Sequence, residues 1–168
     1  MKKIKRTYKF RIYPNEEQKV LFAKTFGCVR FIYNQMLADK IEYYKETKKK
    51  LNNTPAQYKT EFEWLKEVDS LALANAQMNL QKAYNNFFTN PKTGFPKFKS
   101  KHKNRKSYTT NNQKGSITLE NGCLKLPKAN GLIQVKQHRQ IPSDHKIKSV
   151  TISQTSSGKY YASILFEY

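Results

Sequence analysis

Residues 4–13, Ile4-Lys5-Arg6-Thr7-Tyr8-Lys9-Phe10-Arg11-Ile12-Tyr13, alternate along the chain between two kinds of side chain. One face carries Ile4, Tyr8, Phe10 and Ile12, and the other carries Lys3, Lys5, Thr7, Lys9 and Arg11. A period of two predicts a β-strand with one buried face and one cationic face. Because a lone strand is not stable, this one has to pair with strands elsewhere in the chain.

A helical block follows this strand. Pro14 ends the strand, and Asn15 with Gln18 is a helix start in which each side chain caps the other's backbone. Apolar residues then recur at helical spacing as far as about Thr47, with an interruption around Gly27 that predicts a break or kink between two helices. Two helices joined at a small residue also have the shape of a helix-turn-helix. A polar loop over 48–60 and an amphipathic helix over 70–88, capped by Asp69 or Ser70, complete the block.

The chain after residue 115 is predicted to form strands. Asn121-Gly122 lies between two alternating runs, and this pair is the strongest short signal for a hairpin because both residues tolerate positive φ. Further strands are expected over 132–136, 147–154 and 159–168. Pairing the first strand with these later ones closes a small β-barrel and makes the helices an insertion. The predicted fold class is therefore α+β.

The charge of the chain is strongly positive. Its 168 residues contain 32 Lys and Arg against 12 Asp and Glu, which gives a formal net charge of +20. No acid occurs between Asp69 and Glu120, and residues 95–106, called the basic strip below, read Phe-Pro-Lys-Phe-Lys-Ser-Lys-His-Lys-Asn-Arg-Lys. Such a strip fits a surface that faces a polyanion, with Phe95 and Phe98 available for stacking. The alternative is a solvated basic loop that two phenylalanines anchor to a core.

Composition also excludes several classes of protein. No stretch approaches the roughly 18 apolar residues of a membrane-spanning helix, and the basic N-terminus leads into alternation rather than a signal peptide. Cys28 and Cys123 form no Cys-x-x-Cys pair, so neither a structural zinc site nor a disulfide framework is expected, and a reducing cytoplasm fits. The carboxylates and the three histidines are scattered without ligand spacing. We therefore predict no catalytic residues and no metal site.

Several polar residues are candidates for contacts with nucleic acid. In the basic strip they are Lys97, Lys99, Lys101, Lys103 and Arg105; on the first strand, Lys9 and Arg11; on the first helical block, Arg30 and Asn34. The run Tyr108, Thr109, Thr110, Asn111, Asn112, Gln113 carries hydroxyl and amide groups that could read base edges. The competing interpretations are a soluble sheet surface, an exposed helix face and an ordinary polar loop. The rings of Tyr33, Tyr84, Phe87 and Phe88 are expected in the core.

Eight motifs, in order along essentially the whole chain, resemble the amino-terminal half of TnpB (OrfB-type) proteins, which are transposon-encoded RNA-guided endonucleases related to type V CRISPR nucleases. The motifs are Tyr8-Lys9-Phe10-Arg11-Ile12-Tyr13-Pro14, Gly27-Cys28-Val29-Arg30-Phe31-Ile32-Tyr33-Asn34, Val68-Asp69-Ser70, Ala83-Tyr84-Asn85-Asn86-Phe87-Phe88, Gly94-Phe95-Pro96-Lys97-Phe98-Lys99, Ser107-Tyr108, Leu124-Lys125-Leu126-Pro127-Lys128 and Gly158-Lys159-Tyr160-Tyr161-Ala162-Ser163.

The resemblance implies a wedge β-barrel, OB-like, from residues 1–14 and 101–168, with a helical recognition domain inserted over 15–100. It implies that this half binds the guide RNA scaffold and the guide–target duplex, and that it reads a short transposon-adjacent motif in double-stranded DNA. By position, Asn53, Ser70, Ala74 and residues 110–113 would lie near that motif, although Ala74 has no hydrogen-bonding side chain. Lys125 and Lys128 belong to a matching motif and are added to the expected nucleic-acid-binding residues.

Family members continue into a RuvC-like nuclease domain, which binds Mg²⁺, with an inserted four-cysteine zinc module. This chain stops about where that domain is expected to begin, so we expect a truncated product or an expressed fragment that lacks both modules and needs no cofactor. The predicted function is the non-catalytic, nucleic-acid-binding half of such an enzyme in a prokaryotic cytoplasm, associated with the nucleoid. Its partners would be guide RNA and double-stranded target DNA, with no membrane. The alternatives are a stand-alone helix-turn-helix DNA-binding module of a transposase and a general RNA-binding module.

Overall fold

The computed structural model describes residues 2–168, which divide into two compact units. A sheet unit contains residues 2–24 and 105–168, and a helical unit contains residues 25–104. The elements in chain order are β1 (Lys5–Tyr13), α1 (Glu16–Thr47), η1 (Pro55–Tyr58), η2 (Glu63–Glu67), α2 (Ser70–Thr89), η3 (Pro91–Thr93), β2 (Lys106–Asn111), β3 (Thr118–Glu120), β4 (Cys123–Lys125), β5 (Ile133–Lys136), β6 (Lys146–Gln154) and β7 (Tyr160–Glu167), where η marks a 3-10 helix.

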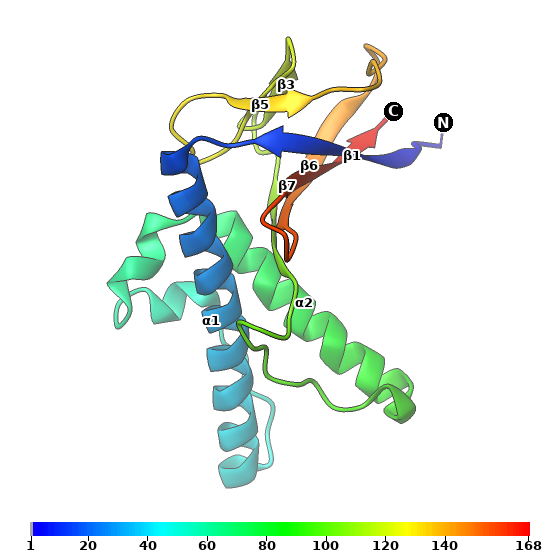
Figure 1. The fold of residues 1–168 in the computed structure, drawn as a ribbon. Helices are drawn as coiled ribbons and strands as arrows, with labels where there is room; N and C mark the ends of the chain where they lie inside the picture. Colours follow the sequence, from blue (N-terminus) through cyan, green and yellow to red (C-terminus); the bar gives the residue numbers. More distant parts are fainter. Residues whose placement is uncertain (1) are drawn as a thin grey trace. The chain divides into compact units, whose positions relative to one another are not determined.

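The strands form one antiparallel sheet in the order β2-β6-β7-β1-β5-β4-β3 (Figure 1). β1 lies in its centre, paired with β7 from Lys5↔Glu167 to Ile12↔Tyr160 and with β5 at Arg11↔Lys136. The two chain ends lie side by side, since the Ile4 and Tyr168 backbones exchange hydrogen bonds of 2.7 and 2.9 Å. The prediction of an α+β fold, with helices inserted after a first strand that pairs with later strands, is confirmed.

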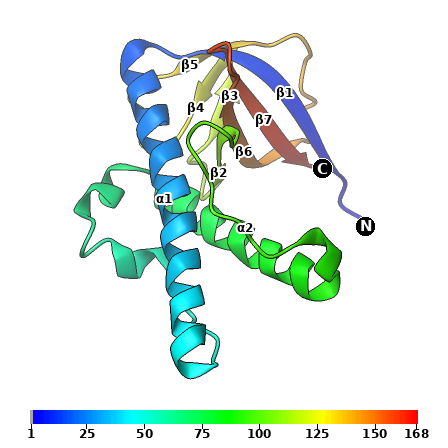
Figure 2. The ribbon, with the colours of Figure 1, turned by 60° about the horizontal axis from the view of Figure 1, so that its bottom comes forward.

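The sheet curls into a half-barrel (Figure 2). The strand order leaves β2 and β3 as its two edges, so the sheet does not close into the full barrel that was expected. The alternation of β1 works as predicted: Tyr8, Phe10 and Ile12 are buried on the inner face. Ile4 is the exception, because it precedes the first residue of the strand and is 52% exposed.

The start of α1 belongs to the sheet unit. The Gln18 backbone N–H donates to Asn15 Oδ1 at 2.8 Å and the Asn15 N–H donates to Gln18 Oε1 at 2.9 Å, which is the predicted pair of caps. The Gln18 amide also donates to the carbonyls of Asn130 and Leu132. Phe22 is fully buried against the rings of Tyr108 and Tyr160. The sheet unit therefore includes the chain as far as Lys24, and the helical unit begins at Thr25.

Helix α1 is continuous, and the predicted break at Gly27 is wrong. Gly27 lacks a positive φ, and a Cβ added there would find its nearest neighbour at 4.0 Å. A glycine lowers helix propensity by about 1 kcal/mol, but tertiary packing overrides a cost of that size. Here the buried side chains of Cys28, Ile32 and Met36 fix the turns that follow.

In the helical unit, residues 25–47 of α1 cross α2, and the segment with η1 and η2 lies beside them in both views (Figures 1 and 2). The core joins α1, α2 and this segment through residues such as Leu37, Leu65 and Leu80. Asp69 caps α2 by accepting from the Leu71 N–H at 3.0 Å. No helix among residues 2–168 is long and apolar enough to cross a membrane.

The strands after the helical unit follow the predictions except for β2. Asn121 and Gly122 have φ of 53° and 71° and turn β3 into β4, as expected for an Asn-Gly hairpin. Residues 106–111, expected to be strip and polar loop, instead form β2 and pair with β6 from Lys106↔Gln154 to Asn111↔Ser149. The pattern was missed because the alternating residues are hydroxyl and amide side chains rather than apolar ones.

Candidate nucleic-acid interface

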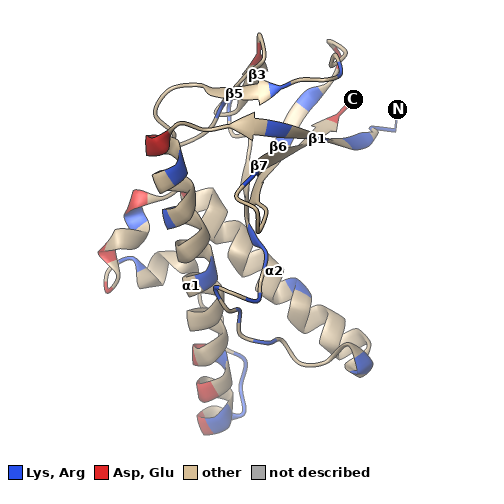
Figure 3. Cartoon of the chain, viewed as in Figure 1, with Lys and Arg blue, Asp and Glu red and all other residues tan. Residues whose placement is uncertain are grey.

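Basic residues occur in both units, whereas acids are confined to a few segments (Figure 3). The acids of the helical unit lie on α1 and over residues 61–69, so that α2 and the loop after it, up to Gly94, are free of them. The basic strip begins at once after this stretch. Its residues 95–104 belong to the helical unit, and Arg105 and Lys106 belong to the sheet unit.

Asn34 on α1 fixes the basic strip to the helical unit. Its Nδ2 donates to the Lys99 carbonyl at 2.8 Å, and its Oδ1 accepts from the Lys99 N–H at 2.7 Å. Pro96 is buried, which anchors the strip a second time. Asn34, predicted to contact nucleic acid, thus engages both the oxygen and the nitrogen of its amide within the protein.

Lys99 also turns inward. Its Nζ lies 4.3 Å from the centroid of the Tyr33 ring, a cation–π contact. Burial lowers the pKa of the Lys99 ammonium from its ordinary value. The side chain is therefore partly withdrawn from solvent, in contrast to the exposed Lys97.

A tight turn over residues 100–104 presents the next cations. The Ser100 N–H donates to Asn104 Oδ1 at 2.7 Å, the Asn104 N–H donates to the Ser100 carbonyl at 3.1 Å, and the His102 N–H donates to Ser100 Oγ at 3.2 Å. Lys101 and Lys103 are exposed on this turn. These hydrogen bonds define the backbone conformation of a segment that has no regular secondary structure. The ammonium groups of Lys101 and Lys103 are exposed to solvent on it.

The cationic face of β1 forms a second candidate surface, in the sheet unit. Lys9 Nζ lies 4.9 Å from the Tyr161 ring centroid, and the Arg11 guanidinium lies 5.1 Å from that of Tyr13. Arg11 stands directly opposite Lys136 on β5. Like charges opposite each other destabilise a sheet, so this pair indicates a position where an anion would add stability. Arg11 Nε is buried without a hydrogen-bond partner, which points the same way.

Lys136 and Tyr161 were not among the sequence candidates. Tyr161 stands in a matching family motif, and Lys136 alternates with the buried Ile133 and Val135 of β5. The alternation of buried and exposed residues predicts on which face of the sheet these two residues lie. Only the pairing of β1 with β5 and β7 shows that they lie beside Arg11. Arg105 donates to Ser153 Oγ at 3.4 Å and is otherwise exposed, and Ser153 stands opposite Tyr161 in the sheet, on the same face as Arg11.

Asn53, which was expected near the DNA motif, lies buried in the helical unit. It is 4% exposed, and its Nδ2 donates to Tyr58 Oη at 2.8 Å. The Tyr58 hydroxyl donates to Asp39 Oδ2 at 2.6 Å. Burial, followed by the bond with Asp39, raises the pKa of Tyr58 well above its ordinary value. The three polar groups tie the segment after α1 back onto the helix.

The run at 108–113 divides into buried and exposed residues. Tyr108 and Thr110 are buried on the inner face of β2, so neither can read a base edge. Asn112 is used by the fold: its Nδ2 donates to the Ile147 carbonyl at 2.9 Å, and its Oδ1 accepts from the Ile117 N–H at 3.1 Å. Asn111 and Gln113 are exposed.

The remaining predicted residues lie at or near the surface. Ser70, Lys125 and Lys128 are exposed, and Arg30 is half-buried on α1. Ala74 is half-buried on α2. Ser70 and Ala74 lie four positions apart on this helix, and hence on one face.

Among residues 2–168, no three His, Cys, Asp or Glu side chains are grouped so that they could hold a metal ion.

Known proteins are similar in sequence to this chain. A family model described as "Helix-turn-helix domain", of the OrfB type, matches residues 1–49. In the structure this region contains β1 and the continuous α1, with no turn between Glu16 and Thr47. The helix-turn-helix of the description is thus represented here by a strand and one long helix.

Three relatives match over longer spans. "Putative RNA-guided DNA endonuclease" of Streptomyces pristinaespiralis is 31% identical, covering 99% of this chain and 42% of that protein. "Putative RNA-guided DNA endonuclease InsQ" of Escherichia coli (strain K12) is 32% identical, covering 95% of this chain and 40% of that protein. "Virulence protein VsdF" of Salmonella dublin is 37% identical, covering 58% of this chain and 94% of that protein. The chain spans less than half the length of the two endonuclease relatives.

Proposed function

The chain belongs to the TnpB (OrfB-type) family, and from this premise we propose that it is a nucleic-acid-binding portion of an RNA-guided DNA endonuclease. In this role it holds guide RNA and target DNA, and the chemistry of strand cleavage is carried by residues outside those described here. The names of the two longer relatives support a role in RNA-guided DNA cleavage.

The observation that carries this proposal is that hydrogen bonds fix the backbone of the basic strip; this fixed backbone is called its frame below. Two hydrogen bonds from Asn34 and the turn at residues 100–104 fix its backbone. A loop that served only solubility would not need a fixed backbone. The frame holds Lys97, Lys101 and Lys103 outward in a stretch of 50 residues, from 70 to 119, that contains no acid. Regularly spaced cations on a fixed backbone match the phosphates of a polynucleotide.

For the sheet unit we propose phosphate binding at Lys9, Arg11 and Lys136. Two positive charges, those of Arg11 and Lys136, face each other here, and Arg11 Nε has no hydrogen-bond partner. Both observations support the binding of an anion on this face. The neighbouring rings of Tyr13 and Tyr161 are half-buried or exposed, and could stack on unpaired bases. Readout of a DNA motif is proposed for Ser70, Asn111 and Gln113, whose side chains are exposed. Asn53 and Thr110 are left out because they are buried.

The test is recovery of bound nucleic acid from the source cell, followed by sequencing. A structured RNA derived from the transposon end, enriched over total RNA, is the expected result. The purified chain should then bind that RNA more tightly than duplex DNA of the same length. Recovery of transposon-end DNA without RNA would overturn the guide-RNA role in favour of a stand-alone DNA binder. A variant of equal charge loss, described in the Discussion, separates specific from general charge effects.

A second candidate is the helix-turn-helix DNA-binding module, which the description of the matched family model favours. In a helix-turn-helix, a second helix enters the major groove across a short turn from the first. Helix α1 offers no such turn between Glu16 and Thr47. This candidate predicts tight binding to duplex transposon ends in the absence of RNA, and the recovery experiment distinguishes it.

A further inference from the structure

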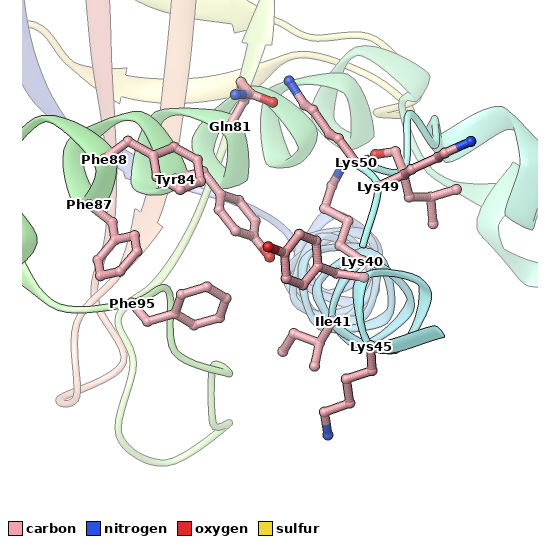
Figure 4. A pocket seen from close by; sticks show the side chains of 12 residues that line it. Lys40, Ile41, Lys45, Lys49, Lys50, Gln81, Tyr84, Phe87, Phe88 and Phe95 are labelled. Carbon is pink, nitrogen blue, oxygen red and sulfur yellow. Dashed lines mark hydrogen bonds between the residues drawn. The ribbon is translucent and has the colours of Figure 1, made fainter. Parts of the chain in front are cut away.

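The helical unit contains a cavity of about 580 Å³ that the candidate interface does not use (Figure 4). It lies between the last turns of α1, the segment after α1, and the end of α2 with the loop that follows. Its size falls in the range of about 300–1,000 Å³ that is typical of sites for small molecules. Two walls of different chemistry line it.

One wall is aromatic. Tyr84, Phe87 and Phe88 project from α2, and Phe95 approaches from the loop (Figure 4). The Phe95 ring stands at 90° and 83° to those of Tyr84 and Phe87, at centroid distances of 5.3 and 5.4 Å. Phe88, expected in the core, is instead 69% exposed and stacks on Tyr84 at 6.0 Å. A contiguous patch of exposed aromatic side chains is typical of a binding site.

The other wall is cationic. Lys40 and Ile41 of α1, with Lys49 and Lys50 of the following segment, line this side of the cavity (Figure 4). Lys40 Nζ is held in place by donating to the Leu51 carbonyl at 2.8 Å. Burial, followed by repulsion from Lys50, lowers the pKa of Lys40. No carboxylate lines the cavity, so its positive charge is not balanced from within.

We propose that this cavity receives an unpaired nucleobase of single-stranded RNA or DNA, stacked on Phe88, with the adjoining phosphates facing Lys49 and Lys50. A flat apolar ring attached to an anionic chain matches an aromatic wall opposite ammonium groups. A base within a duplex is already stacked on its neighbours and cannot enter without being extruded. The inference rests on the proposed nucleic-acid binding and adds a strand-type preference and a specific site.

The experiment measures binding of a short single-stranded oligonucleotide, as RNA and as DNA of one sequence, and of the matching duplex. Phe88→Leu should weaken single-strand binding by roughly 5- to 150-fold, the range for loss of one base–aromatic stack, and leave duplex binding unchanged. Phe88→Trp should retain it, because an indole also stacks. Phe88 is mostly exposed, so neither change disturbs the core. Whichever of RNA and DNA shows the larger effect identifies the source of the base.

A fluorescent base, 2-aminopurine, reports stacking directly, since its emission is quenched on an aromatic ring. Quenching by the original protein and by Phe88→Trp, but not by Phe88→Leu, is expected. Met78→Ala, on the same helix, 65% exposed and outside the cavity, is the control. Equal affinities for the original protein and Phe88→Leu would overturn the proposal. If the original protein bound no nucleic acid at all, the proposed function itself would fail.

Discussion

At the scale of single residues, side-chain amides join segments that are distant in the chain. The Asn34 amide pairs with the backbone of Lys99, 65 positions away, through one donated and one accepted hydrogen bond. Asn112 does the same for Ile117 and Ile147 in the sheet unit. The Asn34 amide satisfies backbone groups of a loop that has no secondary structure to satisfy them, and the Asn112 amide joins the loop residue Ile117 to strand β6.

Asn34→Ala should lower the free energy of unfolding by about 1–3 kcal/mol, because it leaves the N–H and carbonyl of Lys99 without partners. Urea denaturation of the purified chain measures this difference. Asn79→Ala, an exposed asparagine on α2, changes helix propensity equally and serves as the control. Equal stabilities of the two variants would contradict a structural role for Asn34.

Tyr58 predicts a pH dependence with a definite sign. Its pKa is raised from the ordinary value of 10.0, so above that pH the unfolded chain loses a proton that the folded chain keeps. The stabilisation from this group is therefore complete below pH 10.0 and declines as the pH rises above it. Tyr58→Phe should cost about 1–3 kcal/mol at neutral pH by leaving Asp39 and Asn53 without this partner.

Urea melts between pH 7 and 11 should show the difference between the two proteins shrinking on the alkaline side. Other titrating groups cancel in this comparison, because both proteins contain them. A difference that stays constant across the range would mean that the Tyr58 hydroxyl is not protected by burial and by Asp39.

At the scale of elements, the sequence predicted the strand, helix start and turn that neighbouring residues determine. It missed the features that depend on contacts with distant segments. Strand β1 follows from strict alternation, the α1 start from Asn15 with Gln18, and the β3–β4 hairpin from Asn121-Gly122. These signals act within a few residues. Strand β2 was missed because its register with β6 decides that Thr110 faces inward. The roles of Asn34 and Asn53 were missed because their partners lie in other segments.

Gly27→Ala is a test of the continuous helix. If α1 runs unbroken through residue 27, alanine should stabilise the chain by roughly 0.5–1 kcal/mol, because it costs less conformational entropy and its Cβ would meet no atom closer than 4.0 Å outside the neighbouring helix backbone. A glycine in a turn with positive φ would give the opposite sign. Gly158, also in open space but with φ of +88°, is the matched control, and Gly158→Ala should destabilise. If Gly27→Ala lost stability instead, the result would favour a helix-turn-helix with a turn at residue 27.

At the scale of the whole molecule, both units have a net positive charge but expose it differently. The helical unit holds exposed lysines on a loop that Asn34 fixes, whereas the sheet unit presents Lys9, Arg11 and Lys136 on rigid paired strands. Binding through either should leave DNA intact. Incubation with Mg²⁺ and supercoiled plasmid is expected to give no nicking, and cleavage that persists across independent preparations would contradict the proposed division of labour.

The final prediction concerns salt. Each phosphate contact adds roughly 0.7–0.9 to the slope of log affinity against log salt, so changing Lys97, Lys101 and Lys103 together to Ala should flatten it by about 2 to 3. Lys99→Ala alone should barely alter the slope, because that ammonium lies over Tyr33. Lys66, Lys82 and Lys146, changed together, remove the same charge from exposed positions outside the basic strip and control for net charge. Equal flattening in both triple variants would mean that the strip binds only through the overall charge of the chain, and the frame built by Asn34 would then need another explanation.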